Sequence, residues 1–185
     1  MSHLTDIYKL RSAFVALLFI CGLSLPALAQ GQTPAQTPPP ASIKASALQI
    51  QQIQAADEVK LPAEFEISLY ENVIEQVAKT NRFKHVYRDG DHHAGDASDL
   101  VTLHSTVTGF KQGSARARQV TTVAGATSIK VHLKFTDKDG KTLLESDVNG
   151  QVRFFGENLR ATFDFGKKVA AVVRQNFIAP APAAK

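Results

Sequence analysis

Tryptophan is absent from the 185 residues, and cysteine and methionine each occur once. The single cysteine, Cys21, lies in an apolar run near the amino terminus, so a chain that has lost this run contains no thiol. Without a thiol, disulfides, thiolate metal sites and cysteine nucleophiles are all excluded. The formal net charge is only +4, and the basic residues are scattered along the chain. Scattered charge without tryptophan gives no support to nucleic-acid binding.

Catalytic signatures are missing as well. The sequence contains no G-x-S-x-G nucleophile elbow, no Walker phosphate loop and no dinucleotide-binding fingerprint. Its serines have no histidine and acid at an informative spacing. Because catalytic partners can be distant in sequence, a hydrolase with an unrecognised site stays open as an alternative. The main expectation is a protein that is not an enzyme and that has no resident cofactor.

The first 29 residues have the layout of a secretory signal peptide. Lys9 and Arg11 precede an apolar run over residues 13–25, and small residues stand before a cleavage point after Ala29. The run is shorter than the roughly 20 residues that a membrane-spanning helix needs. We therefore expect export to the periplasm or secretion, without a transmembrane span in the mature chain. An uncleaved inner-membrane anchor is the alternative.

Three segments follow the predicted signal peptide. Residues 30–43 are rich in proline, alanine and glutamine, a composition that cannot bury enough apolar surface to offset the entropy of ordering. Residues 179–185 form a short Ala/Pro segment, which we expect to be a disordered tail. Residues 44–178 have the length of one ordinary domain. The sequence thus predicts a single domain between a flexible linker and a tail.

The spacing of apolar residues predicts several strands and two helices. Strands are expected over residues 47–54, 85–88, 100–110, 128–135 and 144–154, and helices from Pro62 and from about Asn158. The last two strands alternate apolar and polar residues on either side of a D-K-D-G turn, which is typical of an antiparallel sheet covered on one face. We predict an α+β two-layer sandwich, with a mostly antiparallel sheet of four or five strands and two helices packed on one face.

The same spacing predicts which side chains face the core. In the first helix, Leu69, Val73 and Val77 form one apolar stripe. In the last helix the predicted stripe has five members, Leu159, Phe163, Ala170, Val173 and Phe177. Strand alternation places His104 and His132 on the open face, where they either join the loop histidines in a cluster or stay separate surface residues.

Residues 88–99, RDGDHHAGDASD, concentrate four aspartates and two histidines. Imidazole and carboxylate groups suit divalent metals, so the candidate ligands are Asp91, His92, His93 and Asp96. Adjacent residues of an extended chain point in opposite directions, which hinders binding of one ion by both histidines. Because Asp and Gly are also typical of connections, we interpret the segment as a solvated loop and keep a divalent-metal site as the alternative.

Residues 113–126, GSARARQVTTVAGA, contain a second unusual group. If this segment is extended, Arg116 and Arg118 point the same way and can bind a carboxylate or a phosphate. The alternative is an edge strand whose positive charges oppose aggregation.

Residues 100–177 resemble a family of bacterial cell-envelope proteins, many of them lipoproteins, that is catalogued as a domain of unknown function. Three motifs carry the resemblance, V-T-G-F at Val107–Phe110, G-S-A-R-A-R at Gly113–Arg118 and G-A-T-S-I-K-V at Gly125–Val131, followed by D-K-D-G-K. The resemblance implies an envelope location and an α+β fold similar to periplasmic assembly-factor domains, and it implies no active site. The chain departs from the lipoprotein members because Cys21 is followed by further apolar residues.

Signal peptide, linker and one-sided sheet together favour a non-enzymatic accessory domain. We expect it to bind an envelope protein or an outer-membrane component, through its sheet or through Arg116 and Arg118. The second hypothesis is a periplasmic divalent-metal binder that uses residues 89–99.

Overall fold

The computed structural model describes residues 43–120, 125–152 and 157–180. The predicted signal peptide, its cleavage point at Ala29, and residues 30–42 of the predicted linker lie outside the described residues, as do residues 181–185 of the tail. In chain order the elements are β1 (Ala47–Ile50), β2 (Gln54–Ala55), α1 (Ala63–Ala78), β3 (His85–Arg88), the 3-10 helix η1 (His92–Asp96), β4 (Leu100–Lys111), α2 (Ala115–Val120), β5 (Thr127–Asp137), β6 (Thr142–Val152) and α3 (Arg160–Asn176).

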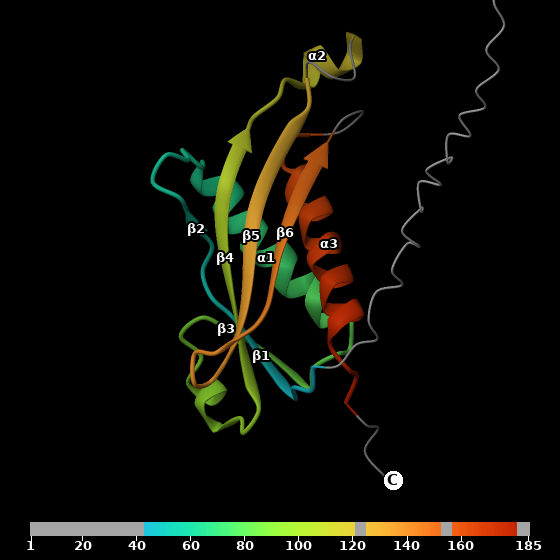
Figure 1. Ribbon diagram of the computed structural model, residues 1–185. Helices are drawn as coiled ribbons and strands as arrows, with labels where there is room; N and C mark the ends of the chain where they lie inside the picture. Colours follow the sequence, from blue (N-terminus) through green and yellow to red (C-terminus); the bar gives the residue numbers. More distant parts are fainter. Residues whose placement is uncertain (1–42, 121–124, 153–156, 181–185) are drawn as a thin grey trace, which may run out of the picture. The chain divides into compact units, whose positions relative to one another are not determined.

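The described strands form one mixed sheet of six strands, in the order β3-β1-β4-β5-β6, with β2 also paired to β4 (Figure 1). The β4-β5 and β5-β6 pairs are antiparallel, whereas β1 is parallel to both β3 and β4. The expectation of a mostly antiparallel sheet of four or five strands was therefore wrong in strand number and for one half of the sheet. The reason is α1, a crossover helix that returns the chain to the same end of the sheet before β3 begins.

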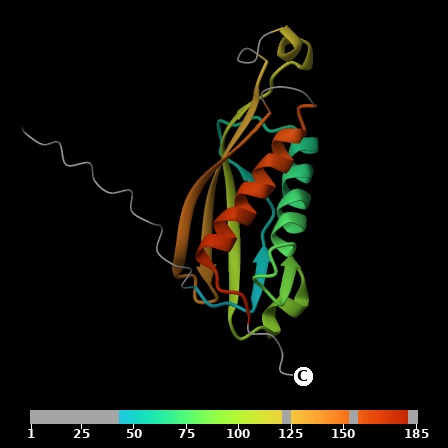
Figure 2. The ribbon, with the colours of Figure 1, turned by 90° about the vertical axis from the view of Figure 1, so that its right-hand side faces the viewer.

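The two long helices, α1 and α3, cover one face of the sheet, and no helix of the described residues lies on the other face (Figures 1 and 2). The predicted α+β fold class, with two helices on one face of the sheet, is thereby confirmed. Strands β5 and β6 meet at a turn in which Gly140 has a φ of 80°, a left-handed conformation that glycine adopts without strain. The turn predicted from the D-K-D-G sequence is therefore present, with its glycine in the left-handed conformation.

The core lies between the sheet and the two helices. In α1 the predicted stripe is buried as expected, with Leu69 and Val73 fully inaccessible to solvent. In α3 the predicted stripe was partly wrong, because Phe163 is 38% exposed and Phe165, two residues further on, is fully buried. Positions two apart on a helix point in nearly opposite directions, so only one of these two phenylalanines can face the core.

Two glycines allow α3 to approach its neighbours closely. A Cβ atom at Gly150 of β6 would lie 2.4 Å from the carbonyl oxygen of Ala161, and one at Gly166 would lie 2.8 Å from the carbonyl oxygen of Asn72 in α1. At the α1–α3 contact the hydroxyl groups of Ser68 and Thr162 are 2.7 Å apart. These contacts fix the rotation of α3 about its own axis and so decide which phenylalanine is buried.

Candidate binding surface

The face of the sheet without helices is polar. Its side chains come from alternate positions of the three long strands, namely Thr102, His104, Thr106 and Thr108 of β4, Ser128, Lys130, His132 and Lys134 of β5, and Glu145, Asp147 and Asn149 of β6. The register sets them in rows across the strands, for example Thr106, His132 and Asp147. We call this set of residues the open face.

Both predicted open-face histidines hydrogen-bond across strands. His132 Nδ1 lies 2.9 Å from a carboxylate oxygen of Asp147, and His104 Nε2 lies 3.3 Å from the hydroxyl of Thr136. The loop histidines lie elsewhere, on η1, and the described residues contain no group of three or more His, Cys, Asp or Glu side chains that could hold a metal ion. The structure thus orients the strand histidines as individual hydrogen-bonding groups.

A shallow hollow of about 300 Å³ lies on the open face between β4, β5 and β6. Polar side chains line it, with Thr108, Lys130, Asp147 and Asn149 among them. The side-chain oxygen of Asn149 is buried, and it has no hydrogen-bond partner among the described residues. The Thr108 hydroxyl, the Lys130 ammonium and the Asp147 carboxylate of the lining offer a ligand both hydrogen-bond donors and acceptors.

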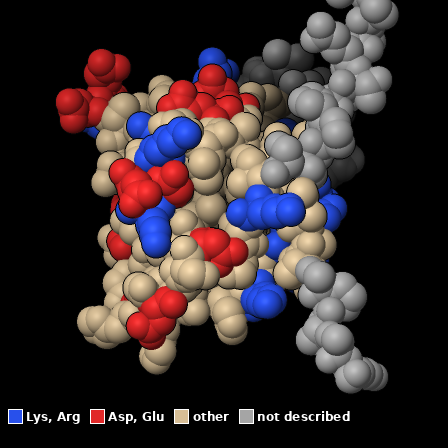
Figure 3. All heavy atoms as spheres, turned by 60° about the horizontal axis from the view of Figure 1, so that its bottom comes forward, with Lys and Arg blue, Asp and Glu red and all other residues tan. Residues whose placement is uncertain are grey.

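Charges of both signs are mixed on the face that Figure 3 shows, rather than gathered in one large patch of either sign. This distribution agrees with the low net charge of the chain.

The central part of the predicted metal-binding segment, residues 88–99, forms the 3-10 helix η1. The Asp91 carboxylate precedes η1, accepts a hydrogen bond from the His93 backbone N–H at 3.0 Å, and lies 3.2 Å from the His93 ring. The backbone hydrogen bond from His93 holds the pKa of Asp91 below its ordinary value. The carboxylate therefore caps a helix, and a metal site at Asp91, His92, His93 and Asp96 stays a prediction.

The predicted arginine pair does not lie on an extended segment. Residues Ala115–Val120 form the short helix α2, and the hydroxyl of Ser114 accepts the Ala117 N–H at 3.3 Å. Serine before a run of Ala, Arg and Gln is a helix-start signal, which the extended interpretation missed. Arg116 is exposed on α2. The expectation that Arg116 and Arg118 point the same way required an extended chain, and a helix does not provide one.

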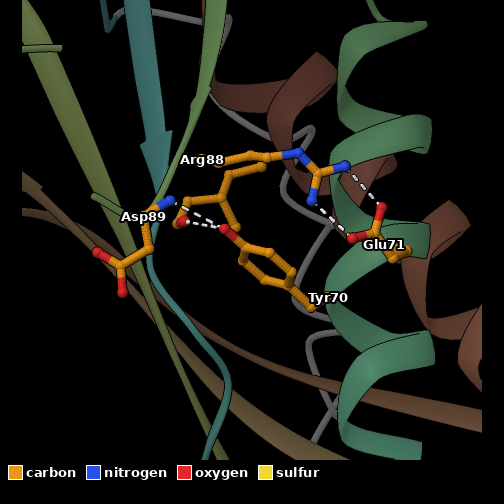
Figure 4. A network of polar contacts seen from close by, with 5 residues as sticks. Tyr70, Glu71, Arg88 and Asp89 are labelled. Carbon is orange, nitrogen blue, oxygen red and sulfur yellow. Dashed lines mark hydrogen bonds and ion pairs between the residues drawn. The ribbon is translucent and has the colours of Figure 1, made fainter. Parts of the chain in front are cut away.

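A polar network that the sequence did not indicate joins α1 to the ends of β1 and β3 (Figure 4). The Arg88 guanidinium donates two hydrogen bonds to the Glu71 carboxylate, at 2.6 and 2.7 Å, and lies 5.7 Å from the centre of the Tyr70 ring. The Tyr70 hydroxyl donates to the Ile50 carbonyl at 3.2 Å and accepts the Asp89 N–H at 2.8 Å. The side-chain hydrogen bond from Arg88 holds the pKa of Glu71 below its ordinary value.

Asp99, the last aspartate of the predicted loop, hydrogen-bonds to Ser46, the residue before β1. Its carboxylate accepts the Ser46 backbone N–H at 2.8 Å and also the Ser46 hydroxyl. The Ser46 hydroxyl is the main reason that the pKa of Asp99 lies below its ordinary value. An open pocket of about 420 Å³ beside this contact is lined in part by Lys44 and Lys84.

These features define a two-layer α+β domain with one helix-covered and one open sheet face. A family model described as a domain of unknown function, DUF4410, matches residues 34–156, and the chain belongs to this family. The expected membership of a family of unknown function is thereby confirmed. A comparison with curated proteins gives no match. In the described residues, no helix has both the length and the apolar character needed to cross a membrane.

Two solved structures of PelC share the fold at low sequence identity, and a third structure matches more weakly. PelC from Paraburkholderia phytofirmans, solved as a dodecamer, is 12% identical, with 75% of this chain and 93% of PelC covered at a TM-score of 0.53. A substituted PelC from the same organism, also a dodecamer, is 13% identical and covers 74% and 93% of the two chains at a TM-score of 0.51. A Xanthomonas campestris protein of the DUF330 family is 11% identical, covers 75% and 84%, and has a TM-score of 0.43.

Proposed function

We propose that this protein is an exported, envelope-associated accessory domain that binds another envelope component through its open face and is not an enzyme. The hollow on that face, lined by Thr108, Lys130, Asp147 and Asn149 among others, is the observation that carries the proposal. Among the described residues no helix covers this face, and its rows of Thr, His and Lys offer both donors and acceptors to a partner.

Export and envelope association rest on the sequence. The charged start, the apolar run and the small residues before Ala29 support a cleaved signal peptide.

Self-assembly is a second proposed property, and the dodecameric state of PelC favours it. A domain with two chemically different faces can bind copies of itself with one surface and a second component with the other. We propose that the protein works as an assembly of identical chains whose open faces remain available.

Site-specific photo-crosslinking in intact cells tests the binding proposal. A photoreactive residue replaces Thr106 or His132 on the open face, and in a matched control it replaces Asp139 in the exposed β5-β6 turn. We expect a discrete adduct from the two open-face positions, and its loss when Lys130→Glu and Asp147→Lys are added. Equal labelling from position 139, or adducts that survive the two substitutions, would contradict a binding role for the open face.

A further inference from the structure

The two helices that cover the sheet expose side chains of opposite charge. The exposed acids of α1 are Glu64, Glu66, Glu71 and Glu75. The exposed basic residues of α3 are Arg160, Lys167, Lys168 and Arg174. We call Glu66 and Glu71, which both line one pocket beside Ile67, the α1 acidic surface, and the four basic residues of α3 the α3 basic surface.

These surfaces are not neutralised by each other within one chain. Glu71 pairs with Arg88, Glu75 pairs with Lys79, and Lys168 pairs with Asp164 of its own helix. In the part of the chain that the structure describes, no ion pair joins an acid of α1 to a base of α3. The α1–α3 contact consists of other groups, among them the hydroxyls of Ser68 and Thr162.

Each charged surface also carries one large exposed apolar side chain. Ile67 of α1 is 65% exposed, and Phe163 of α3 is 38% exposed. The Lys167 ammonium lies 4.8 Å from the centre of the Phe163 ring, so the aromatic group and a positive charge form one unit. Ile67 borders a pocket of about 220 Å³, whose other lining residues include Ile53, Glu66 and Tyr70.

We propose that the α1 acidic surface of one copy binds the α3 basic surface of a second copy, with Phe163 seated in the pocket beside Ile67. Phe163 would meet Ile53 and the Tyr70 ring, and Lys167 would approach the Glu66 carboxylate. The apolar contact supplies affinity, and the charges select the orientation and the partner. This inference rests on the proposed self-assembly and names the surfaces that perform it.

The charges also determine the symmetry of the contact. Two α1 surfaces facing each other would bring acids together, and two α3 surfaces would bring bases together, so a two-fold pairing of like surfaces is disfavoured. The pocket beside Ile67 is bordered by residues between β1 and β2, whereas Asp164 and Lys168 of α3 bind the backbone of β6 at the far edge of the sheet. The two surfaces therefore lie toward opposite edges of the sheet, and a head-to-tail contact of this kind produces a ring or a filament.

Charge reversal on each surface provides the test. The first variant is Glu66→Lys, at a carboxylate that lines the pocket beside Ile67, and the second combines Lys167→Glu with Arg174→Glu. A control variant, Lys138→Glu with Lys141→Glu, makes the same charge change as the second variant in the exposed β5-β6 turn. The mass of each purified full-length protein is measured by sedimentation and by light scattering over a range of concentration and salt.

We expect the wild type and the control to assemble, and each reversed variant to self-associate at least about tenfold more weakly because like charges now meet. An equimolar mixture of the two reversed variants should assemble again, since a basic α1 then meets an acidic α3. Salt should weaken all of these assemblies.

Two contrary results separate the inference from the proposed function. A wild type that stays monomeric at the highest concentrations would overturn both the self-assembly and the helix contact. Reversed variants that assemble as the wild type does, or a mixture that stays dissociated, would overturn only the helix contact and leave self-assembly through another surface.

Discussion

The two faces of the sheet are built by the same strands and have opposite chemistry. In β5, Ile129, Val131 and Leu133 are buried beneath the helices, while the residues between them, Lys130 and His132, reach the open face. Because successive side chains alternate, a strand can stabilise the fold with one half of its residues and remain free to bind with the other. Substitutions on the helix-covered face should therefore change stability, and those on the open face should change binding.

The largest difference is expected between two phenylalanines of α3. Phe165→Ala removes a fully buried ring and should lower the free energy of unfolding by about 3–5 kcal/mol. Phe163→Ala, two residues away and 38% exposed, should cost less than about 1 kcal/mol. Urea unfolding of both variants measures this difference. Equal decreases in the free energy of unfolding would contradict the orientation of α3 that buries Phe165 and exposes Phe163.

Two glycines of the sheet give the next contrast. Gly150→Ala forces a methyl group against the Ala161 carbonyl and the Phe165 side chain, and should cost about 1–3 kcal/mol or more. Gly109→Ala should change stability by less than about 1 kcal/mol, because the added Cβ meets only the Lys130 side chain at 3.5 Å. Thermal unfolding of both variants checks the expectation, and a stable Gly150→Ala protein would contradict the close packing of β6 and α3.

The polar network at the β1 and β3 ends should give a smaller effect. Tyr70→Phe removes the hydroxyl that binds the Ile50 carbonyl and the Asp89 N–H, at a cost of about 1 kcal/mol. Tyr87→Phe is a suitable control, since the Tyr87 ring stacks on His85 and its hydroxyl makes no hydrogen bond to another described residue. The denaturant midpoints of the two variants are compared. Equal midpoints would show that the hydrogen bonds of the Tyr70 hydroxyl do not stabilise the fold.

The ion pair in the same network predicts a pH dependence. The pKa of Glu71 is lowered in the folded protein by the hydrogen bond from Arg88, so the unfolded chain binds the proton more readily. The stabilisation is present above the ordinary carboxyl pKa of about 4.5 and is lost as the pH falls through the lower folded value. Because the pair is half exposed, the loss should be below about 1 kcal/mol. Glu71→Gln should show a shallower loss of stability in acid, and an unchanged slope would contradict this assignment.

The smallest effect is expected for added zinc. Asp91 already caps η1, and the described residues contain no three-ligand group, so zinc should not raise the melting temperature measurably. Titration calorimetry with the wild type and with His92→Ala, His93→Ala measures any affinity. A stoichiometric signal that the substitutions abolish would contradict this expectation and support the metal site.

Periodicity predicted the elements of this fold well because each depends on local spacing. The β5-β6 hairpin, β3 and the buried stripe of α1 were confirmed on this basis. The prediction failed where two local interpretations competed. Phe163 and Phe165 both fit an apolar helix, and Gly150 and Gly166 then selected Phe165 through contacts between elements distant in sequence.

The candidate surfaces were less predictable than the elements. Alternation placed His104 and His132 on the open face, yet the hollow beside Asn149 depends on the register of three strands. The Arg88–Glu71 pair joins residues of different elements with no sequence signal. The opposite charges of α1 and α3 are visible in the sequence, but only the packing shows that both are exposed.

The sequence by itself determined the alternating strands and the amphipathic helices, since each follows from local spacing. Tertiary structure alone decided the parallel placement of β1 and β3, the rotation of α3 and the neighbours of every polar side chain on the open face. These depend on contacts between distant residues, whose free energy is not encoded in any short segment.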